Sequence, residues 1–209
     1  SANTAMGYGA ARNTTTGASN TAIGYLAMDV NTTGASNTAV GAFALDANTE
    51  AANNTAVGYL SLSANTTGDS SVAVGKDSMK TNTTGRFNSA LGYESLALNT
   101  TGANNVALGK AALYANTTAS NNTAVGFASL GANTTGTGNN ALGTNSLAAC
   151  TTGDYNVAIG YESQRLTTTA DNNTGLGSYT LYDNTTGADN TAVGFSALGN
   201  NTTASNNTA

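Results

Sequence analysis

The chain has 209 residues, of which 30 are Asn, 37 are Thr and 25 are Gly, and it contains no His, Pro or Trp. Only 8% of the residues are charged and the formal net charge is −5, so we expect no nucleic acid and no anionic membrane among its partners. The lack of His removes the commonest general base and the commonest metal ligand, and a single Cys excludes disulfide frameworks and thiolate zinc sites. No apolar run approaches the roughly 20 residues of a membrane span, and from the first residues we expect no signal peptide.

One motif recurs along the whole sequence. The segment NTAIGY at residues 20–25 returns as NTAVG at 37–41 and again at 54–58. Its Gly recurs at a constant interval of 17 residues, from Gly7 to Gly194, without one insertion or deletion. Such a fixed period is typical of repeat proteins, in which each unit stacks on copies of itself.

Within each repeat the predicted elements follow in the same order. In the second copy we expect one strand over 20–24, a second over 25–28, and a turn or short third strand over 31–34, because alternating side chains point to opposite faces of a strand. A 17-residue unit is too short for two helices and a turn. Coils stacked about 4.8 Å apart would give twelve coils a length of roughly 58 Å. The sequence therefore predicts an all-β fold: one parallel β-solenoid, or β-roll, of twelve 17-residue coils over residues 1–209.

The predicted interior is thin. We use "column" for residues at the same place in successive repeats. The column before the Gly is aliphatic or Met in every copy, and the column four places after it is Leu or Met except at Ala11 and Gln164. We assign the first of these columns to the structural core: Ile23, Val40, Val57, Val74, Leu91, Leu108, Val125, Leu142, Ile159, Leu176 and Val193.

Asn occupies further columns. Stacked copies such as Asn20, Asn37 and Asn54 predict ladders of side-chain amides along the rod. The Asn-Thr-Thr triplets also have the form of glycosylation acceptors, which would line one edge with glycans; the alternative is that they only build the turn and its ladder. The candidate acceptors are Asn31, Asn65, Asn82, Asn99, Asn116, Asn133, Asn184 and Asn201.

An aromatic residue follows the Gly in seven of the twelve copies. Such a stripe can stack on sugar rings, and the alternative is that it packs against neighbouring coils or chains. The candidate glycan-binding stripe consists of Tyr25, Tyr59, Tyr93 and Tyr161. Five copies interrupt it: Ala42, Lys76, Lys110, Thr144 and Ser178.

Three pairs of acidic residues are 17 positions apart and would lie about 4.8 Å from each other in a solenoid. Close carboxylates can serve glycoside hydrolysis or bind calcium. Each pair occurs once, in its own column, and none has other polar groups to support it, so solvated surface carboxylates are favoured. We expect no catalytic residues, no metal site and no cofactor. The pairs are Asp29 with Asp46, Asp77 with Glu94, and Asp154 with Asp171.

Two further predictions concern single residues. Asp69 and Arg86 are also 17 positions apart and predict an exposed salt bridge of small value. Cys150 stands in a column that otherwise holds mostly Asn, which predicts a free thiol, with an inter-chain disulfide as the alternative.

The repeats resemble those of a known family. NVALG at 105–109, NVAIG at 156–160 and SVAVG at 71–75 resemble the NSVAIG repeats of YadA-like trimeric autotransporter adhesin heads. The longer unit, NTAVGYxALxxNTTG, is similar to repeats of large bacterial surface proteins and phage tail-fibre-like proteins. The resemblance implies a left-handed parallel β-roll, three chains wound as a trimer, and adhesion to host or matrix surfaces. It covers the whole chain in pattern, although the head repeat of that family is usually shorter, so the NTTG residues would enlarge the outer turn.

The expected function is that of a structural, non-enzymatic repeat region in an extracellular fibrous protein, either a surface adhesin head or stalk or a phage tail fibre. The alternatives are a self-stacking extracellular filament subunit and a carbohydrate-binding module that uses the Tyr stripe on a cell-surface or matrix glycan. The expected location is extracellular, at a cell surface or in a virion fibre.

Two sequence features bear on assembly. The columns of Ala two places before the Gly, and of the Gly itself, fit the close approach of another backbone, which predicts a homo-oligomer. The repeats run to both ends without atypical capping coils, so we expect a window of a longer array or a unit that stacks end to end.

Overall fold

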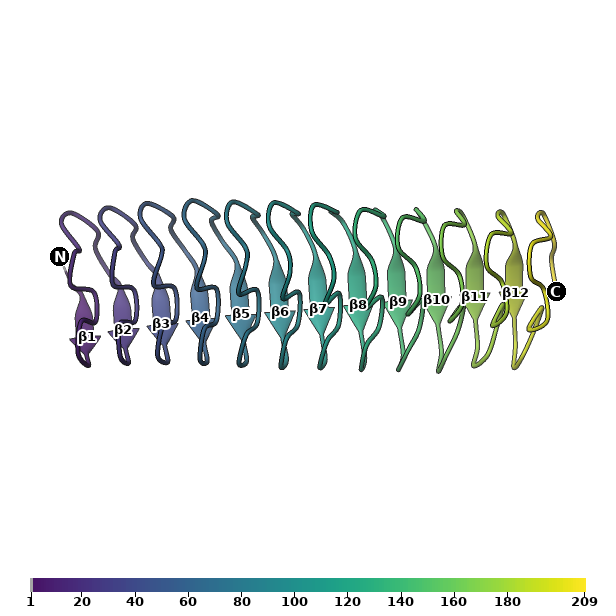
Figure 1. Cartoon of the computed structure of the whole chain (residues 1–209), viewed down its shortest axis with the longest axis horizontal. Coiled ribbons are helices and arrows are strands. Elements are labelled where there is room, and N and C mark those ends of the chain that lie inside the picture. Colours follow the sequence, from purple (N-terminus) through teal and green to yellow (C-terminus); the bar gives the residue numbers. More distant parts are fainter. Residues whose placement is uncertain (1) are drawn as a thin grey trace.

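The computed structural model describes residues 2–209, which form one rod of stacked coils (Figure 1). Twelve short strands lie side by side along the rod in sequence order, all parallel, in one sheet. Each strand residue pairs with the residue 17 positions later, as Thr21 does with Thr38. The predicted all-β parallel solenoid with a 17-residue coil is therefore confirmed. The strands are β1 (Thr4–Met6), β2 (Thr21–Ile23), β3 (Thr38–Val40), β4 (Thr55–Val57), β5 (Val72–Val74), β6 (Ser89–Leu91), β7 (Val106–Leu108), β8 (Thr123–Val125), β9 (Asn140–Leu142), β10 (Val157–Ile159), β11 (Thr174–Leu176) and β12 (Thr191–Val193).

Each coil has one strand only, and the rest of it is a series of turns. The residues two and four places after the Gly have left-handed backbone angles, with φ of 52° at Leu26 and 54° at Met28. Such residues cannot belong to an extended strand. Backbone hydrogen bonds between coils continue nevertheless, since the Leu26 N–H donates to Tyr8 O and the Met28 N–H to Ala44 O, both at 2.9 Å. The predicted second strand is therefore wrong, whereas the NTTG segment is a turn as expected.

The strand buries the opposite face from the one predicted to face the core. In β2 to β12 the middle residue, such as Ala22, is buried. The opposite wall is built by the column four places after the Gly, in which Leu45 and Leu130 are fully buried. The predicted core column is instead half-buried or exposed, and Leu91 and Leu142 expose 49% and 47% of their surface. The core assignment is therefore wrong for Ile23, Val40, Val57, Val74, Leu91, Leu108, Val125, Leu142, Ile159, Leu176 and Val193.

Strand geometry explains this reversal. Because successive side chains point to opposite faces, burying the Ala places both of its neighbours outside. The small Ala faces the large Leu or Met of the opposite wall, so the thin interior is filled by one large side chain per coil. The Gly that follows is also required inside the chain: Gly24 has φ of 137°, and a Cβ built on it would lie 2.6 Å from Gly41 O. Both small columns thus serve stacking within one chain, and the backbone that approaches them closely is that of the neighbouring coil.

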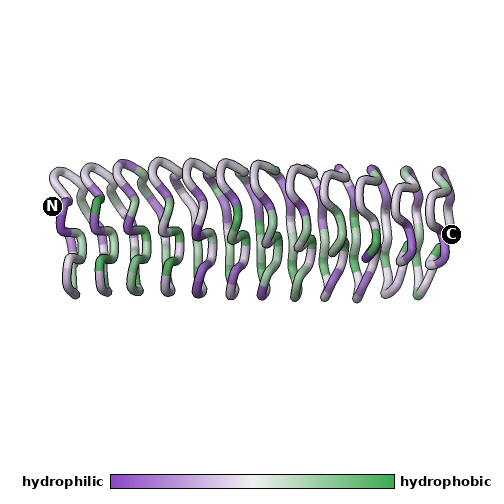
Figure 2. The backbone as a smooth tube through the Cα atoms, in the orientation of Figure 1, coloured by the Kyte–Doolittle hydropathy of each residue, from purple (hydrophilic) through white to green (hydrophobic). Residues whose placement is uncertain are grey.

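Two ladders of buried Asn fill the other half of the coil. The Nδ2 atoms of Asn20 and Asn31 donate to the same carbonyl, Gly34 O, at 2.8 and 3.0 Å. Along the rod, the Asn37 N–H donates to Asn20 Oδ1 at 2.9 Å, and Asn48 Nδ2 donates to Asn31 Oδ1 at 2.8 Å. Figure 2 shows the resulting division of the coil, with the hydrophobic residues mostly in the half that holds the strands. The predicted amide ladders are confirmed, and they let a thin coil bury polar groups without leaving them unpaired.

Candidate functional site: the outer surfaces of the rod

The outward-facing side of the sheet is a strip of aliphatic and small polar side chains, which we call the aliphatic face. It consists of the first and third residues of β2 to β12. Its most apolar part lies on β5 to β7, where Val72, Leu91, Val106 and Leu108 are exposed and line a shallow groove of about 170 Å³. With coils about 4.8 Å apart and about 3.3 Å per strand residue, the whole face measures roughly 50 Å by 10 Å. Its exposed aliphatic part on β5 to β7 is the kind of surface that commonly marks an interaction site.

A second surface, the aromatic ridge, follows the edge of the rod next to the aliphatic face. Where the Tyr column has Ala42, the ring of Phe43 occupies the gap, with centroids 5.4 Å from Tyr25 and 6.2 Å from Tyr59. Tyr179 does the same where the column has Ser178. The ridge consists of Tyr8, Tyr25, Phe43, Tyr59, Lys76, Tyr93, Lys110, Phe127, Tyr161, Tyr179 and Phe195.

The two lysines continue the ridge instead of breaking it. Lys76 Nζ lies 5.8 Å from the ring centroid of Tyr59 and 5.2 Å from that of Tyr93. Lys110 Nζ lies 5.7 Å from the rings of both Tyr93 and Phe127. These are cation–π distances. Of the five predicted interruptions, only Thr144 separates neighbouring members of the ridge. The four residues of the predicted stripe, Tyr25, Tyr59, Tyr93 and Tyr161, are all exposed on it.

Nearby carboxylates raise the pKa of three residues of the ridge. A hydrogen bond to Glu94 raises the pKa of the Tyr93 phenol, and a hydrogen bond to Glu162 raises that of Tyr161. A hydrogen bond to Asp77 raises the pKa of Lys76. These three shifts favour the protonated forms of Tyr93, Tyr161 and Lys76.

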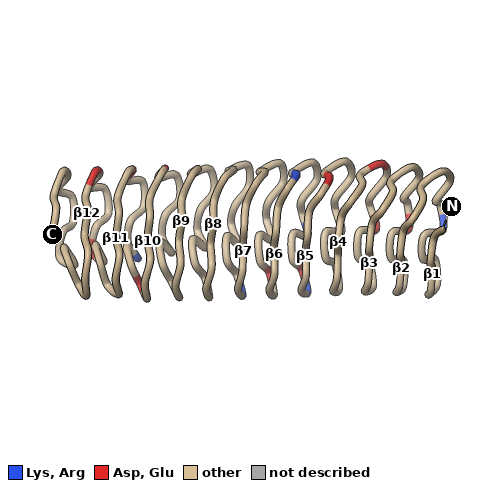
Figure 3. Tube along the Cα trace, turned by 180° about the vertical axis from the view of Figure 1, so that it is seen from behind, with Lys and Arg blue, Asp and Glu red and all other residues tan. Residues whose placement is uncertain are grey.

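The remaining charges are few and scattered along the rod (Figure 3). Arg86 and Asp69 lie 3.9 Å apart with both side chains partly exposed, which confirms the predicted surface salt bridge. In the part of the chain that the structure describes, no group of three or more Cys, Asp or Glu side chains could hold a metal ion. Nor does any helix within residues 2–209 have the length and apolar character needed to cross a membrane.

The predicted carboxylate pairs have other structural contacts. Asp29 forms an ion pair with Arg12 at 2.8 Å. Burial raises the pKa of Asp46, and the charge of Asp29 on the next coil adds to this. In the pair nearer the C-terminus, Asp171 accepts a hydrogen bond from the backbone N–H of Asp154 at 2.8 Å. In these two pairs, then, a carboxylate is tied to an arginine or to the backbone of the neighbouring coil.

The third pair, Asp77 and Glu94, belongs to the ridge. Asp77 forms an ion pair with Lys76, and Glu94 contacts the Tyr93 phenol. Both carboxylates are therefore engaged by side chains of the ridge.

The Asn-Thr-Thr edge does not offer its amides for modification. Asn99 is representative: it is fully buried, and its Nδ2 donates to Asn82 Oδ1 at 2.7 Å and to Gly102 O at 3.0 Å. Seven of the eight candidate acceptors are fully buried, and Asn201 is partly buried and makes the same bonds. A glycan on Nδ2 would require removing the residue from the ladder. The folded rod therefore favours the alternative, in which these residues build the turn and its ladder, over glycosylation of Asn31, Asn65, Asn82, Asn99, Asn116, Asn133, Asn184 and Asn201.

Cys150 is a buried free thiol, as predicted. Burial raises its pKa to about 11, and its Sγ lies 3.6 Å from Gly153 O. The thiol interrupts an Asn ladder and leaves Asn133 Oδ1 without a hydrogen-bond partner; Thr167 Oγ1, one coil further, also has none. Because the sulfur is enclosed, the geometry does not favour a disulfide to another chain.

In comparisons with known proteins, no family model, no curated protein and no solved structure matches the chain. Its function must therefore be inferred from the two surfaces and from the rod that carries them.

Proposed function

We propose that the chain is a rigid, non-enzymatic rod in an extracellular fibrous protein, a surface adhesin head or stalk or a phage tail fibre, and that it assembles as a homotrimer. The observation that carries this proposal is the aliphatic face, which keeps one register over β2 to β12. Because every coil has the same length, another copy of the chain has the same spacing of side chains. It can therefore pack against the face coil by coil.

The size of the face supports lateral assembly. The strip covers roughly 500 Å² per chain, of which about half is apolar, because the first strand residue is Thr, Ser or Asn in eight of the eleven strands. At about 25 cal/mol per Å², this half corresponds to about 6 kcal/mol before the cost of association. The strip as a whole is smaller than the roughly 800 Å² per partner of a standard stable interface. We therefore expect the assembly also to cover part of the adjacent aromatic ridge. The trimeric state and the extracellular location follow from the resemblance to adhesin heads and tail-fibre repeats.

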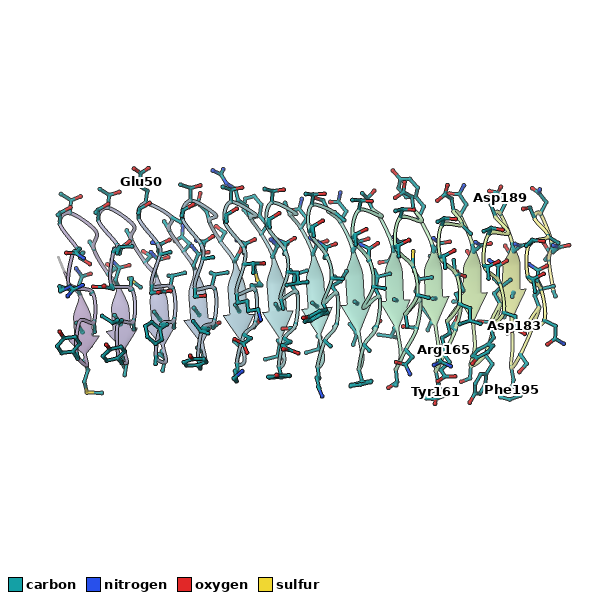
Figure 4. The ribbon with its side chains drawn as sticks, viewed as in Figure 1. Glu50, Tyr161, Arg165, Asp183, Asp189 and Phe195 are labelled. Carbon is teal, nitrogen blue, oxygen red and sulfur yellow. The ribbon has the colours of Figure 1, made fainter. Side chains whose placement is uncertain are left out.

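Sedimentation velocity over a range of concentrations tests this proposal. Leu91→Asp combined with Leu108→Asp places two charges on the aliphatic face without entering the core. The matched control, Thr101→Asp combined with Thr118→Asp, places the same charges on the opposite, exposed edge of the same two coils. That edge already holds an acidic residue, Glu50, in the same column (Figure 4).

We expect the wild type and the control to sediment as the same oligomer, and the Leu variant to sediment as a folded monomer with an unchanged circular dichroism spectrum. A wild type that is monomeric at every concentration, a Leu variant that stays assembled, or growth into head-to-tail filaments would contradict the proposal.

A second candidate function, glycan binding along the aromatic ridge, is favoured by the continuity of the ridge from Tyr8 to Phe127. Glycan-array binding should be lost on combining Tyr25→Ala with Tyr59→Ala. It should persist in Tyr114→Ala, because Tyr114 lies in a different column, away from the ridge. Binding that survives the double substitution would exclude this function.

A further inference from the structure

A shallow depression lies across the coils that carry β11 and β12. It has a volume of about 220 Å³ and is lined by Tyr179, Tyr182, Asp183, Ser196, Gly199 and Asn200. Figure 4 shows Arg165, Asp183 and Phe195 near this end of the rod. The volume is below the range of about 300–1,000 Å³ that is typical of sites for drug-sized ligands. It corresponds to roughly seven water molecules at about 30 Å³ each, which matches a ligand with a single ring.

The ring of Tyr182 has a side chain packed on one of its faces and a glycine on the other side. On the side of the preceding coil, the Arg165 guanidinium lies 5.9 Å from the Tyr182 ring centroid and donates a hydrogen bond to its hydroxyl at 2.7 Å. On the side of the following coil, the same column holds Gly199, which has no side chain to cover the ring. Tyr179 forms a second aromatic wall, with its centroid 5.7 Å from that of Tyr182.

Polar groups lie beside the open ring. Asp183, Ser196 and Asn200 provide a carboxylate, a hydroxyl and an amide. Arg165, the cation that packs on Tyr182, pairs with Glu162 at 3.7 Å. None of the ion pairs within residues 2–209 involves Asp183. Its carboxylate therefore remains available to accept hydrogen bonds from a ligand.

We propose that this pocket binds one neutral pyranose ring of a glycan. The apolar C–H face of a sugar ring fits the half-buried ring of Tyr182 on the side where the next coil has Gly199, since aromatic faces carry partial negative charge and bury large apolar areas. Sugar hydroxyls donate to Asp183 through charge-assisted hydrogen bonds and exchange hydrogen bonds with Ser196 and Asn200. The negative charge of Asp183 disfavours anionic sugars. The pocket contains no residue of the aliphatic face and shares Tyr179 alone with the aromatic ridge. Binding of a glycoside and assembly of the rod are therefore measured separately.

The chain contains an internal control for this site. Tyr114 is followed one coil later by Gly131 in the same column, which repeats the arrangement of Tyr182 and Gly199. The flanking columns there hold only Ala, so neither a second ring nor a polar group is present. Those residues are Ala111, Ala115, Ala128 and Ala132.

Saturation-transfer NMR with the 209-residue chain tests the proposal, with methyl β-D-glucopyranoside, methyl β-D-galactopyranoside and methyl β-D-glucuronide as probes. Gly199→Tyr covers the open face of Tyr182, in a column that already accepts Tyr. Gly131→Tyr is the matched control. Thermal melting and sedimentation of both variants verify that fold and assembly are unchanged.

We expect transfer to the ring protons of at least one neutral glycoside, weaker binding of the glucuronide, and an affinity that falls by about tenfold or more in Gly199→Tyr, because the aromatic contact is lost. Gly131→Tyr should bind as the wild type does, and Asp183→Asn should reduce the discrimination against the glucuronide. No transfer to either neutral probe, or equal binding by Gly199→Tyr and the wild type, would overturn the proposal.

Discussion

Leu130→Ala and Leu142→Ala make the same chemical change inside and outside the rod, in two successive coils. Leu130 is fully buried in the column four places after the Gly, whereas Leu142 exposes 47% of its surface on the aliphatic face. Truncation of a buried Leu to Ala costs about 3 kcal/mol, because transfer energy is lost and a cavity remains. At Leu142 about half of the apolar area is already in water and no cavity forms, so the expected cost is about 1 kcal/mol.

Urea unfolding followed by circular dichroism measures both costs, at protein concentrations low enough for the chain to be monomeric. Each variant is compared with the wild type at the same concentration, because assembly would add its own stabilisation. Raising the concentration should increase the cost of Leu142→Ala and leave that of Leu130→Ala unchanged. If Leu142→Ala were as destabilising as Leu130→Ala in the monomer, our assignment of the inner and outer faces of the strand would be refuted.

Three further predictions concern the polar columns. Asn99→Ala should cost about 2–3 kcal/mol in urea unfolding, because it leaves buried ladder partners unpaired, whereas Thr134→Ala should lose one half-exposed hydrogen bond worth about 1 kcal/mol; equal costs would show that the Thr turn is covered in the assembly. Cys150→Asn should raise the unfolding free energy by about 1 kcal/mol, because it restores the ladder beside Asn133 Oδ1, and no gain would mean that the unpartnered oxygen is satisfied in another way. The folded-state pKa of Cys150 is about 11, above the ordinary 9.0, so the neutral thiol is favoured by folding. Stability from this group should therefore be present below pH 9 and be lost as the pH rises towards 11, and a disulfide reagent at about pH 8 should label the thiol only after unfolding.

The period and the register could be predicted from the sequence because they depend only on the recurrence of the same residue types at a fixed interval. A Gly every 17 residues fixes which residues stack, and stacked copies of Asn then form ladders whichever way the coil is wound. The salt bridge between Asp69 and Arg86 follows from the same register.

Which face of the strand is buried could not be predicted in this way. Alternation in Thr-Ala-Val-Gly shows that Ala and Val point to opposite faces, and it does not show which face is inside. Hydrophobicity favours Val, but the volume left beside the Leu of the opposite wall favours Ala, and volume decides in so thin a coil. The missing second strand has a related cause, since left-handed angles at residues such as Leu26 carry no signal in a residue type that rarely adopts them.

The surface sites depended on neighbouring columns. The ridge looks interrupted when one column is read alone, and Phe43 and Tyr179, one residue further along, close two of the gaps. The pocket at Tyr182 is formed by residues from three columns in two successive coils. A signal for it was present in the sequence, because Tyr182 and Gly199 are 17 residues apart and Asp183 and Asn200 are the next pair.

The central claim is that copies of the rod meet through the aliphatic face. Electron microscopy of the assembled protein, averaged in cross-section, tests it most directly. We predict three chains around one axis, with the outward faces of β5 to β7 towards the centre and the Asn-Thr-Thr turns on the outside. A single chain per cross-section, or chains that meet through the Asn-Thr-Thr turns, would contradict the claim.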